Sequence, residues 1–423
     1  MKKIKLLVSV ILLFAVILTS FVGCGDKATV DSGSGGGTAE TGATSTETSL
    51  SNTAKLLKTE KKLTIGYIGG SITLGTSAKQ YVSGSDLNKE ANIKNSWVNR
   101  TSAYFAEQYP DATIETVNVG ISNTQTNFGI YRLAKHLMNT DGHDMPDLVF
   151  IEFTSNDWNS GEELKIEIES LIRNIYAANP YAEIVVLSTN VNSASESRKL
   201  YREVCGEYKI PFVDVGTKLR GAIREKFGST SENGPYFYTV DNLHPSAEGY
   251  KIYTDLIIET IEPLLKTELE SDKLYNNFEN LRAPLCSNLI SNPKTIEATG
   301  LTFEGNTSKV SEPLNVSFHG TGLTVNTIPY VNEYILMNNG SKVSYTFTGN
   351  TFGVLVGFTK TGFTIRYRID GGEWKTYSNV NSHLYVHTQV KILEHTLSEG
   401  THTVEIEVQS DGFRLGAILI NEK

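Results

Sequence analysis

Short apolar runs alternate with segments of helical periodicity between residue 61 and about residue 267. Apolar residues at positions 164, 168, 171, 172 and 175 follow the i, i+4, i+7, i+8 spacing of a helix, and residues 95–109, 126–139 and 194–208 also indicate helices. The apolar runs are typical of strands covered on both faces of a parallel sheet; they are Leu63–Ile68, Thr113–Val119, Asp147–Phe153, Glu183–Ser188 and Ile210–Val215. This alternation predicts a three-layer, mostly parallel α/β domain, which we assign to residues 56–268.

After residue 275 the pattern changes to a period of two. Val343, Tyr345 and Phe347 alternate with polar residues, and similar alternation recurs over residues 363–369 and 403–409. The run 363–369 is followed by Asp370-Gly371-Gly372, which is typical of a hairpin turn. We therefore expect residues 275–423 to form a second domain, an antiparallel β-sandwich or jelly roll.

The N-terminus has the pattern of a secretion signal. Lysines at positions 2, 3 and 5 precede an apolar run from Leu6 to Leu18, and Gly23-Cys24 follows. About 13 apolar residues are too few for a typical membrane-spanning helix. The Gly-Cys pair resembles the bacterial lipobox, in which the cysteine is lipidated; the alternative is a plain signal peptide with an incidental cysteine. We expect residues 1–23 to be a lipoprotein signal peptide and Cys24 to anchor the chain at the extracellular face of the bacterial cell membrane, or else the chain to be secreted.

Residues 24–55 are predicted to be a flexible tether. Positions 25–55 hold 6 Gly, 5 Ser and 7 Thr and no aromatic residue. A segment of this composition buries too little apolar surface to fold by itself.

The overall composition excludes several classes of protein. The formal net charge is −9, from 38 Lys and Arg against 47 Asp and Glu, without basic blocks, so a nucleic-acid binder is not expected. The 3 cysteines show no zinc-ligand spacing and cannot form a disulfide scaffold. Cys205 is predicted to be buried in a helix, so we expect it and Cys286 to be free thiols; the alternative is that the two pair outside the cytoplasm. No metal or other cofactor is expected.

A serine and a histidine at the ends of predicted elements are candidates for catalysis. Gly69-Gly70-Ser71-Ile72-Thr73 directly follows the first strand, at the edge where open α/β sheets bind ligands. It is not a GxSxG nucleophile elbow, and a GGS turn is often only a turn. Far downstream, Asp241-Asn242-Leu243-His244-Pro245 precedes a helical segment. An Asp three residues before a His either orients the imidazole as a general base or forms a surface ion pair.

Two further polar loops follow strands of the same domain. Asn118-Val119-Gly120 ends the second strand, and Thr154-Ser155-Asn156-Asp157 ends the third. A glycine N–H can approach a ligand closely and an Asn side chain can donate, so both groups suit an oxyanion hole together with the Ser71 N–H. Alone, Gly120 fits a plain turn and Asn156 a helix N-cap. Their joint occurrence, each after a strand, favours a catalytic site.

In this order the motifs around Ser71, Gly120, Asn156-Asp157 and Asp241-x-x-His244-Pro resemble the four blocks of the SGNH (GDSL-like) hydrolase superfamily. The resemblance extends over about residues 63–266. It implies a flavodoxin-like sheet and serine esterase chemistry, with Ser71 as nucleophile, His244 as base and Asp241 as the orienting carboxylate. It also implies an oxyanion hole made of the Ser71 and Gly120 N–H groups and the Asn156 side chain, with no metal.

The expected substrate follows from the same resemblance. The GGSIT start is similar to that of a carbohydrate-esterase branch, and a β-sandwich beside an esterase is often a carbohydrate-binding partner. Net negative charge favours neutral glycans such as acetylated xylan or mannan. The expected function is therefore a cell-surface serine esterase that removes O-acetyl groups from polysaccharide through an acyl-enzyme. The alternatives are an SGNH lysophospholipase, thioesterase or acyltransferase, and a non-catalytic glycan-binding lipoprotein.

Several aromatic residues are candidates for stacking on sugar rings. For each of them the alternative is core packing or cross-strand pairing, and the second domain then only braces the first. The candidates are Trp158, Tyr236 and Tyr238 near the catalytic loops, and Tyr330, Tyr334, Tyr367, Trp374 and Tyr377 in the second domain.

Overall fold

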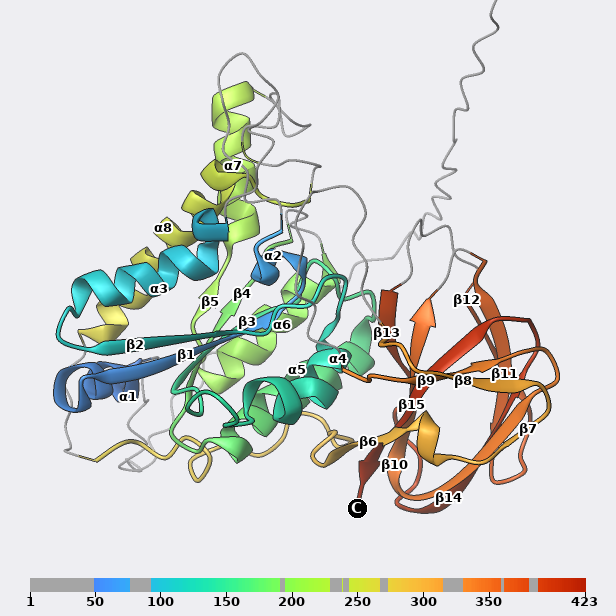
Figure 1. The fold of residues 1–423 in the computed structure, drawn as a ribbon. Coiled ribbons are helices and arrows are strands. Elements are labelled where there is room, and N and C mark those ends of the chain that lie inside the picture. The colour runs from blue at the N-terminus through green and yellow to red at the C-terminus, as the bar shows by residue number, and fades with distance from the viewer. Residues whose placement is uncertain are drawn as a thin grey trace, which may run out of the picture. The chain divides into compact units, whose positions relative to one another are not determined.

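A computed structural model describes residues 49–76, 93–190, 195–228, 238, 243–266, 273–314, 330–358, 361–379 and 387–423. It contains a parallel α/β domain followed by an antiparallel β domain (Figure 1). The fold class expected from the sequence is therefore confirmed. Within the described ranges, no helix is long and apolar enough to cross a membrane.

Five parallel strands form the central sheet of the α/β domain, in the order β2-β1-β3-β4-β5. They lie within a residue or two of the predicted runs and are β1 (Lys62–Gly69), β2 (Thr113–Asn118), β3 (Leu148–Glu152), β4 (Glu183–Leu187) and β5 (Phe212–Val213). Strands β3 and β4 are buried along their whole length because helices cover both faces. The order is the flavodoxin-like one, in which ligands bind at the carboxyl ends of the strands near the switch point between β1 and β3.

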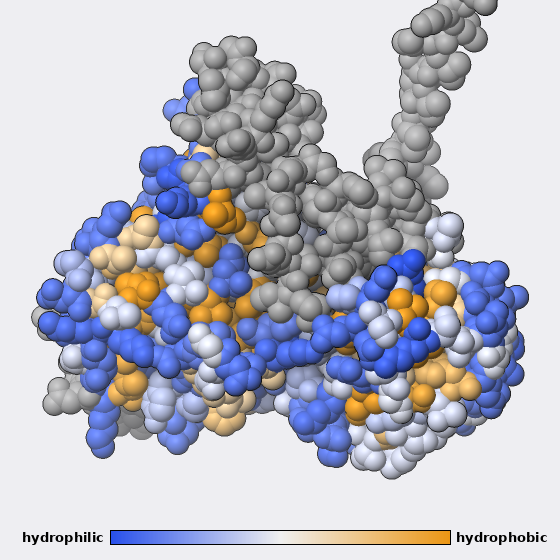
Figure 2. Space-filling model, in the orientation of Figure 1, coloured by the Kyte–Doolittle hydropathy of each residue, from blue (hydrophilic) through white to orange (hydrophobic). Residues whose placement is uncertain are grey.

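Two layers of helices cover the sheet (Figure 1). One layer shares an apolar core with β1 and β3 and consists of α1 (Ser51–Lys55), α3 (Trp97–Gln108), α7 (Val215–Phe227) and α8 (Ala247–Leu265). The other consists of α4 (Thr126–Arg132), α5 (Gly161–Ala178) and α6 (Glu196–Tyr208). Short helical turns are η1 (Leu56–Glu60), α2 (Ser71–Leu74), η2 (Ile93–Asn95), η3 (Leu133–Leu137) and, in the β domain, η4 (Ala298–Gly300). Figure 2 shows hydrophilic residues over much of the visible surface, with hydrophobic residues exposed between them.

The tether boundary predicted at residue 55 is wrong. Ser51–Lys55 is helical, and Leu50, Ala54 and Leu57 are buried in the core of the α/β domain. The first N–H groups of this helix donate to the carboxylate of Glu183 at 3.0 and 2.8 Å. The Gly/Ser/Thr-rich composition hides the i, i+4, i+7 spacing of these three apolar residues, which marks one face of a short helix.

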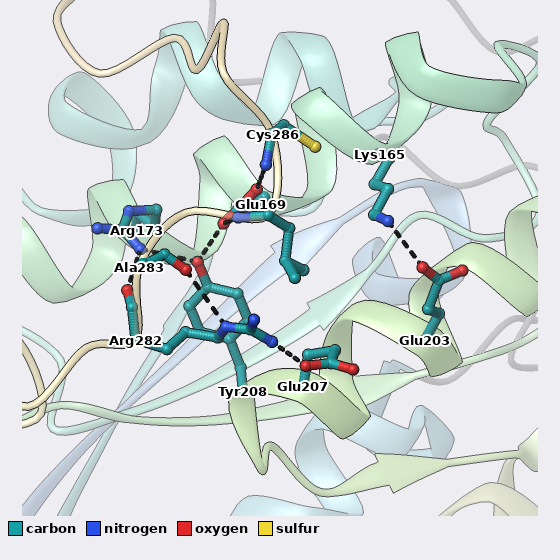
Figure 3. Close-up of polar contacts among 10 residues, drawn as sticks. Lys165, Glu169, Arg173, Glu203, Glu207, Tyr208, Arg282, Ala283 and Cys286 are labelled. Carbon is teal, nitrogen blue, oxygen red and sulfur yellow. Dashed lines mark hydrogen bonds and ion pairs between the residues drawn. The ribbon is translucent and has the colours of Figure 1, made fainter.

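The expected start of the β domain at residue 275 is also too early. Residues 273–292 run along the α/β domain, where the fully buried Glu169 of α5 accepts hydrogen bonds from the main-chain N–H groups of Leu285 (2.7 Å) and Cys286 (2.8 Å) (Figure 3). The first strand of the β domain is β6 (Pro293–Glu297). Residues 273–292 therefore form a connector that is fixed to α5 and whose last residues also bond to Asn421 of β15 (Phe413–Glu422).

The β domain is a sandwich built around one long strand, β10 (Lys342–Phe358). The first half of β10 pairs with β14 (Gly400–Val408), and the second half pairs with β13 (His387–Glu394) and β15 (Phe413–Glu422). The other strands are β7 (Phe303–Glu304), β8 (Thr307–Val310), β9 (Tyr334–Met337), β11 (Phe363–Ile369) and β12 (Lys375–Asn379). The predicted hairpin is confirmed: β11 and β12 are antiparallel, and Asp370 and Gly371 have φ angles of 53° and 69°.

One apolar cluster contains buried residues of both domains, among them Phe128 of α4 and Val390 of β13. The Tyr330 hydroxyl donates to the Tyr131 carbonyl at 2.8 Å, and Lys135 Nζ donates to the Tyr330 carbonyl at 2.6 Å. Residues 47–423 accordingly form a single compact unit.

Candidate active site

Ser71 lies at the carboxyl end of β1, where the chain turns into α2. The turn packs closely on β3: a Cβ on Gly69 would stand 2.4 Å from the carbonyl oxygen of Glu152, so only glycine fits there. Gly75 ends α2 with a φ of 89°. Ser71 is 5% exposed in this tight turn, and so its hydroxyl is held in one place at the edge of the sheet.

His244 meets Ser71 directly. The distance between Ser71 Oγ and His244 Nε2 is 2.7 Å, and the imidazole is 4% exposed. With Nε2 unprotonated, the serine hydroxyl donates to the imidazole, as a nucleophile does to its general base. Asp241, the predicted orienting carboxylate, lies outside the described residues.

Helix α8 fixes the position of His244 relative to the nucleophile. Ser246 caps this helix by accepting from the Gly249 N–H at 3.2 Å. One turn further on, the buried Tyr250 hydroxyl lies 3.2 Å from the Ile72 carbonyl and 3.0 Å from the Thr76 carbonyl, both in the nucleophile turn. The element that carries His244 is thus bonded to the element that carries Ser71.

Asn156 lies beside the nucleophile turn, as the sequence predicts for an oxyanion donor. Its Nδ2 donates to the Thr124 carbonyl at 2.9 Å and would stand 2.3 Å from a Cβ placed on Gly70. An amide nitrogen carries two hydrogens, so one bond to Thr124 fixes the direction of the other N–H. The amide is therefore oriented next to the residue that precedes Ser71.

Gly120 contacts α2, but its N–H has a partner. A Cβ on Gly120 would stand 2.4 Å from the Leu74 nitrogen, so the residue permits close packing of the β2 end on α2. Its N–H donates to Asn118 Oδ1 at 2.9 Å, and Asn118 Nδ2 donates to the Thr73 carbonyl at 2.9 Å. A role of Gly120 in the oxyanion hole would require this N–H to exchange its partner, and it stays a prediction.

A buried carboxyl group lies under the nucleophile turn and was not recognised from the sequence. Glu152, the last residue of β3, is 2% exposed and accepts from Thr73 Oγ1 at 2.9 Å and Thr189 Oγ1 at 2.7 Å. Burial raises the pKa of Glu152 to about 7, although these hydrogen bonds oppose the shift. The signal was available: Glu152 is the one ionisable residue among the five residues of this buried apolar strand.

Arg132 was also missed. This arginine of α4 is fully buried, and its guanidinium donates to the carbonyls of Gly69 (3.0 Å) and Val119, joining the ends of β1 and β2. Burial lowers the pKa of Arg132 to about 9. A guanidinium at this place holds together the two loops that flank the nucleophile.

The aromatic candidates differ in how far the structure leaves them accessible to a sugar. Tyr330, Tyr334 and Tyr367 are buried, so their proposed stacking on sugars is wrong and the core-packing alternative holds. Trp374 is covered by Arg366 and Arg368, whose guanidinium carbons lie 4.5 and 4.6 Å from its ring centroid. The other candidates differ in exposure: Trp158 is 62% exposed, Tyr238 and Tyr377 are partly buried, and Tyr236 lies outside the described residues.

Two further expectations concern cysteine and metal. Cys205 and Cys286 are buried and free, as predicted, whereas Cys24 lies outside the described residues. No group of three or more His, Cys, Asp or Glu side chains in the described part of the chain is arranged to hold a metal ion.

Residues 67–252 match the model of the GDSL-like Lipase/Acylhydrolase family. This part of the chain is therefore similar to the GDSL-like lipases and acylhydrolases (SGNH hydrolases), in agreement with the four motifs of the sequence. The match includes Ser71, Gly120, Asn156 and His244.

The chain is similar to two crystal structures of a two-domain esterase (CEX) active on acetylated mannans. One aligns with a TM-score of 0.68 and 17% identity, over 88% of this chain and 96% of that chain. The other, co-crystallized with mannopentaose, aligns with a TM-score of 0.67 and 17% identity, over 89% and 96%. At this identity the likeness shows a shared two-domain fold. None of the curated protein sequences matches this chain.

Proposed function

We propose that this protein is a serine esterase that removes O-acetyl groups from a polysaccharide such as acetylated mannan or xylan. The proposal rests chiefly on the 2.7 Å contact between Ser71 Oγ and His244 Nε2 at the carboxyl end of the parallel sheet. A serine and an imidazole in this geometry are the nucleophile and general base of acyl transfer. The family match over the same residues supports cleavage of an ester.

In the first step, His244 Nε2 takes the proton of the Ser71 hydroxyl while Oγ attacks the carbonyl carbon of the acetyl group. The Asn156 amide and the Ser71 N–H donate to the oxyanion. Collapse of the intermediate breaks the bond to the sugar oxygen, which takes the proton from His244, and leaves acetyl-Ser71. A water molecule that gives a proton to His244 then attacks the acetyl carbon. The bond to Ser71 Oγ breaks, Oγ takes the proton from His244, and acetate is released. Asp241 orients the imidazole through Nδ1.

Two observations support an acetylated, neutral polysaccharide. The two-domain esterase whose fold this chain shares acts on acetylated mannans. The formal charge of −9 disfavours anionic polymers. We assign Trp158, exposed and two residues after Asn156, to stacking on a pyranose ring next to the scissile ester.

The test compares the purified protein with its Ser71→Ala variant, using p-nitrophenyl acetate, acetylated mannan and acetylated xylan. We expect acetate release to fall by about 10⁴-fold or more, while Ser344→Ala, a change of an exposed strand residue, retains it. Esters of acetyl, butyryl and octanoyl groups measure the size of the acyl site. Faster release of octanoate than of acetate would favour a lipid or thioester substrate, and no release from any ester by folded protein would refute the esterase.

We also propose that lipid on Cys24 holds the protein at the extracellular face of the cell membrane. The signal-like N-terminus and the Gly23-Cys24 pair support this location. Metabolic labelling with a fatty-acid analogue should mark the wild type and not Cys24→Ala; equal labelling of both would refute the anchor.

A further inference from the structure

The loop between β2 and α4, residues 119–125, is bonded to the Asn156 loop. Asn156 Nδ2 donates to the Thr124 carbonyl at 2.9 Å, and Gln125 Nε2 donates to the Asn156 carbonyl at 2.8 Å. These two bonds run in opposite directions between the two loops. A shift of the β2–α4 loop therefore moves the Asn156 amide with it.

The β domain holds the same loop from the other side. Gln389 of β13 is 4% exposed, and its Nε2 donates to the carbonyl of Asn123. Asn123 has a φ of 59°, a left-handed conformation that is uncommon for residues other than glycine and needs support from its surroundings. The Gln389 amide supplies such support, because it fixes the carbonyl that this conformation turns toward β13.

We propose that Gln389 is a positioning residue of the esterase site, acting from the β domain through Asn123 and Thr124 on the Asn156 amide. The proposal rests on the esterase function proposed above. Thr124, whose carbonyl accepts from Asn156, is bonded covalently to Asn123, whose carbonyl accepts from Gln389. The β domain is thereby part of the catalytic apparatus, and its effect extends to small esters that make no contact with a glycan-binding surface.

Gln389→Met tests this role, because methionine keeps the length of the side chain and removes the donor. A displacement of about 1 Å at a reacting group costs about 10²-fold in rate. Since Gln389 acts indirectly, we expect kcat for p-nitrophenyl acetate to fall by about 10-fold with little change in KM. The matched control is Lys135→Met, which removes another donor between the two domains, to the Tyr330 carbonyl, and leaves the β2–α4 loop untouched.

Two readouts separate positioning from a general loss of stability. In the full chain carrying Asn156→Ala, the added Gln389→Met should have no further effect on kcat, because both changes act through one amide. Hydrogen–deuterium exchange of the peptide spanning residues 121–126 should be faster in Gln389→Met and unchanged in Lys135→Met. The exchange measurement does not depend on esterase activity.

Wild-type kcat in folded Gln389→Met, a loss that multiplies with that of Asn156→Ala, or unchanged exchange in the loop would each overturn the proposal. Failure of the esterase function itself is distinguishable, since wild type and Ser71→Ala would then release acetate equally, whereas the exchange measurement would still decide the role of Gln389.

Discussion

Replacing Gly70 by alanine is expected to disable the oxyanion hole while leaving the fold intact. Gly70 has φ −88° and ψ −150°, an extended conformation that alanine also adopts, so the change adds no backbone strain. The new methyl carbon, however, would stand 2.3 Å from Asn156 Nδ2. The perturbation therefore acts on one amide group beside the nucleophile.

The size of the effect follows from this distance. Ordinary contacts of a Cβ begin at 3.4 Å, so Nδ2 has to move by about 1 Å, and its bond to the Thr124 carbonyl is stretched or lost. Loss of one oxyanion donor costs about 10²- to 10³-fold in kcat. We expect kcat for p-nitrophenyl acetate to fall by about 10²-fold, with little change in KM, because the donor acts on charge that develops in the transition state.

The assay measures kcat, KM and thermal unfolding for wild type, Gly70→Ala, Asn156→Ala and the double variant. Because the methyl group acts through Asn156, the double variant should be no slower than Asn156→Ala alone. Gly206→Ala in α6 is the matched control, since nothing lies within 4 Å of the added Cβ, and it should retain wild-type activity. Full activity of folded Gly70→Ala, or losses that multiply in the double variant, would refute the reasoning.

Two further predictions concern buried charged groups. Burial raises the pKa of Glu183 to about 7, above the ordinary value of 4.5 for a glutamate. The folded protein therefore keeps the proton of Glu183 to a higher pH than the unfolded chain does. This difference in proton binding stabilises the folded state fully below about pH 4.5, and the stabilisation is lost as the pH rises through 7. Relative to Glu183→Gln, the free energy of unfolding of the wild type should fall by about 3 kcal/mol over this window in urea titrations; a rise would contradict the shift. Arg132→Met leaves the buried Val119 carbonyl without its guanidinium donor, at a cost of about 1–3 kcal/mol, whereas the Gly69 carbonyl keeps the Ile121 N–H. It should lower both stability and kcat, and unchanged values of both in guanidinium unfolding and p-nitrophenyl acetate assays would show that Arg132 does not join these loops.

The α/β sheet was predictable because each strand carries its own local signal. A run such as Leu148–Glu152 is apolar through burial on both faces, and its neighbours in the sheet are apolar for the same reason. The contact between Ser71 and His244 was also predictable from the sequence. Each residue lies next to the end of a strand or helix, and the order of the motifs indicated their roles. Helix α1 was missed because three apolar residues in a Gly/Ser/Thr-rich segment are a weak signal until the sheet beneath them is known.

The remaining site residues depend on contacts between distant parts of the chain. Glu152 and Thr189 are 37 residues apart and Gln389 and Asn123 are 266 apart, so neither pairing has a local pattern. Such long-range contacts form only when the elements pack together. In the sequence, their only sign is a single polar residue among apolar neighbours. The partner of the Gly120 N–H, in contrast, is local: Asn118 accepts from the N–H two residues further on, as in an Asx turn, and this spacing was available in the sequence.

The fixing of the connector to Glu169 affects how the chain can be divided or recombined. The change in hydrophobic period near residue 275 suggests a domain boundary at that point. However, the N–H groups of Leu285 and Cys286, which lie beyond it, donate to the carboxylate of Glu169 in α5. A cut at that point removes two N–H donors from Glu169, which keeps only the Tyr208 hydroxyl, and leaves the Leu285 and Cys286 N–H groups of the other fragment without their acceptor. The end of the connector is bonded to the sandwich as well, because Asn421 of β15 accepts from the Asn292 N–H and donates to the Leu289 carbonyl. Exchange of the sandwich between related enzymes therefore has to keep residues 273–292 matched to both domains.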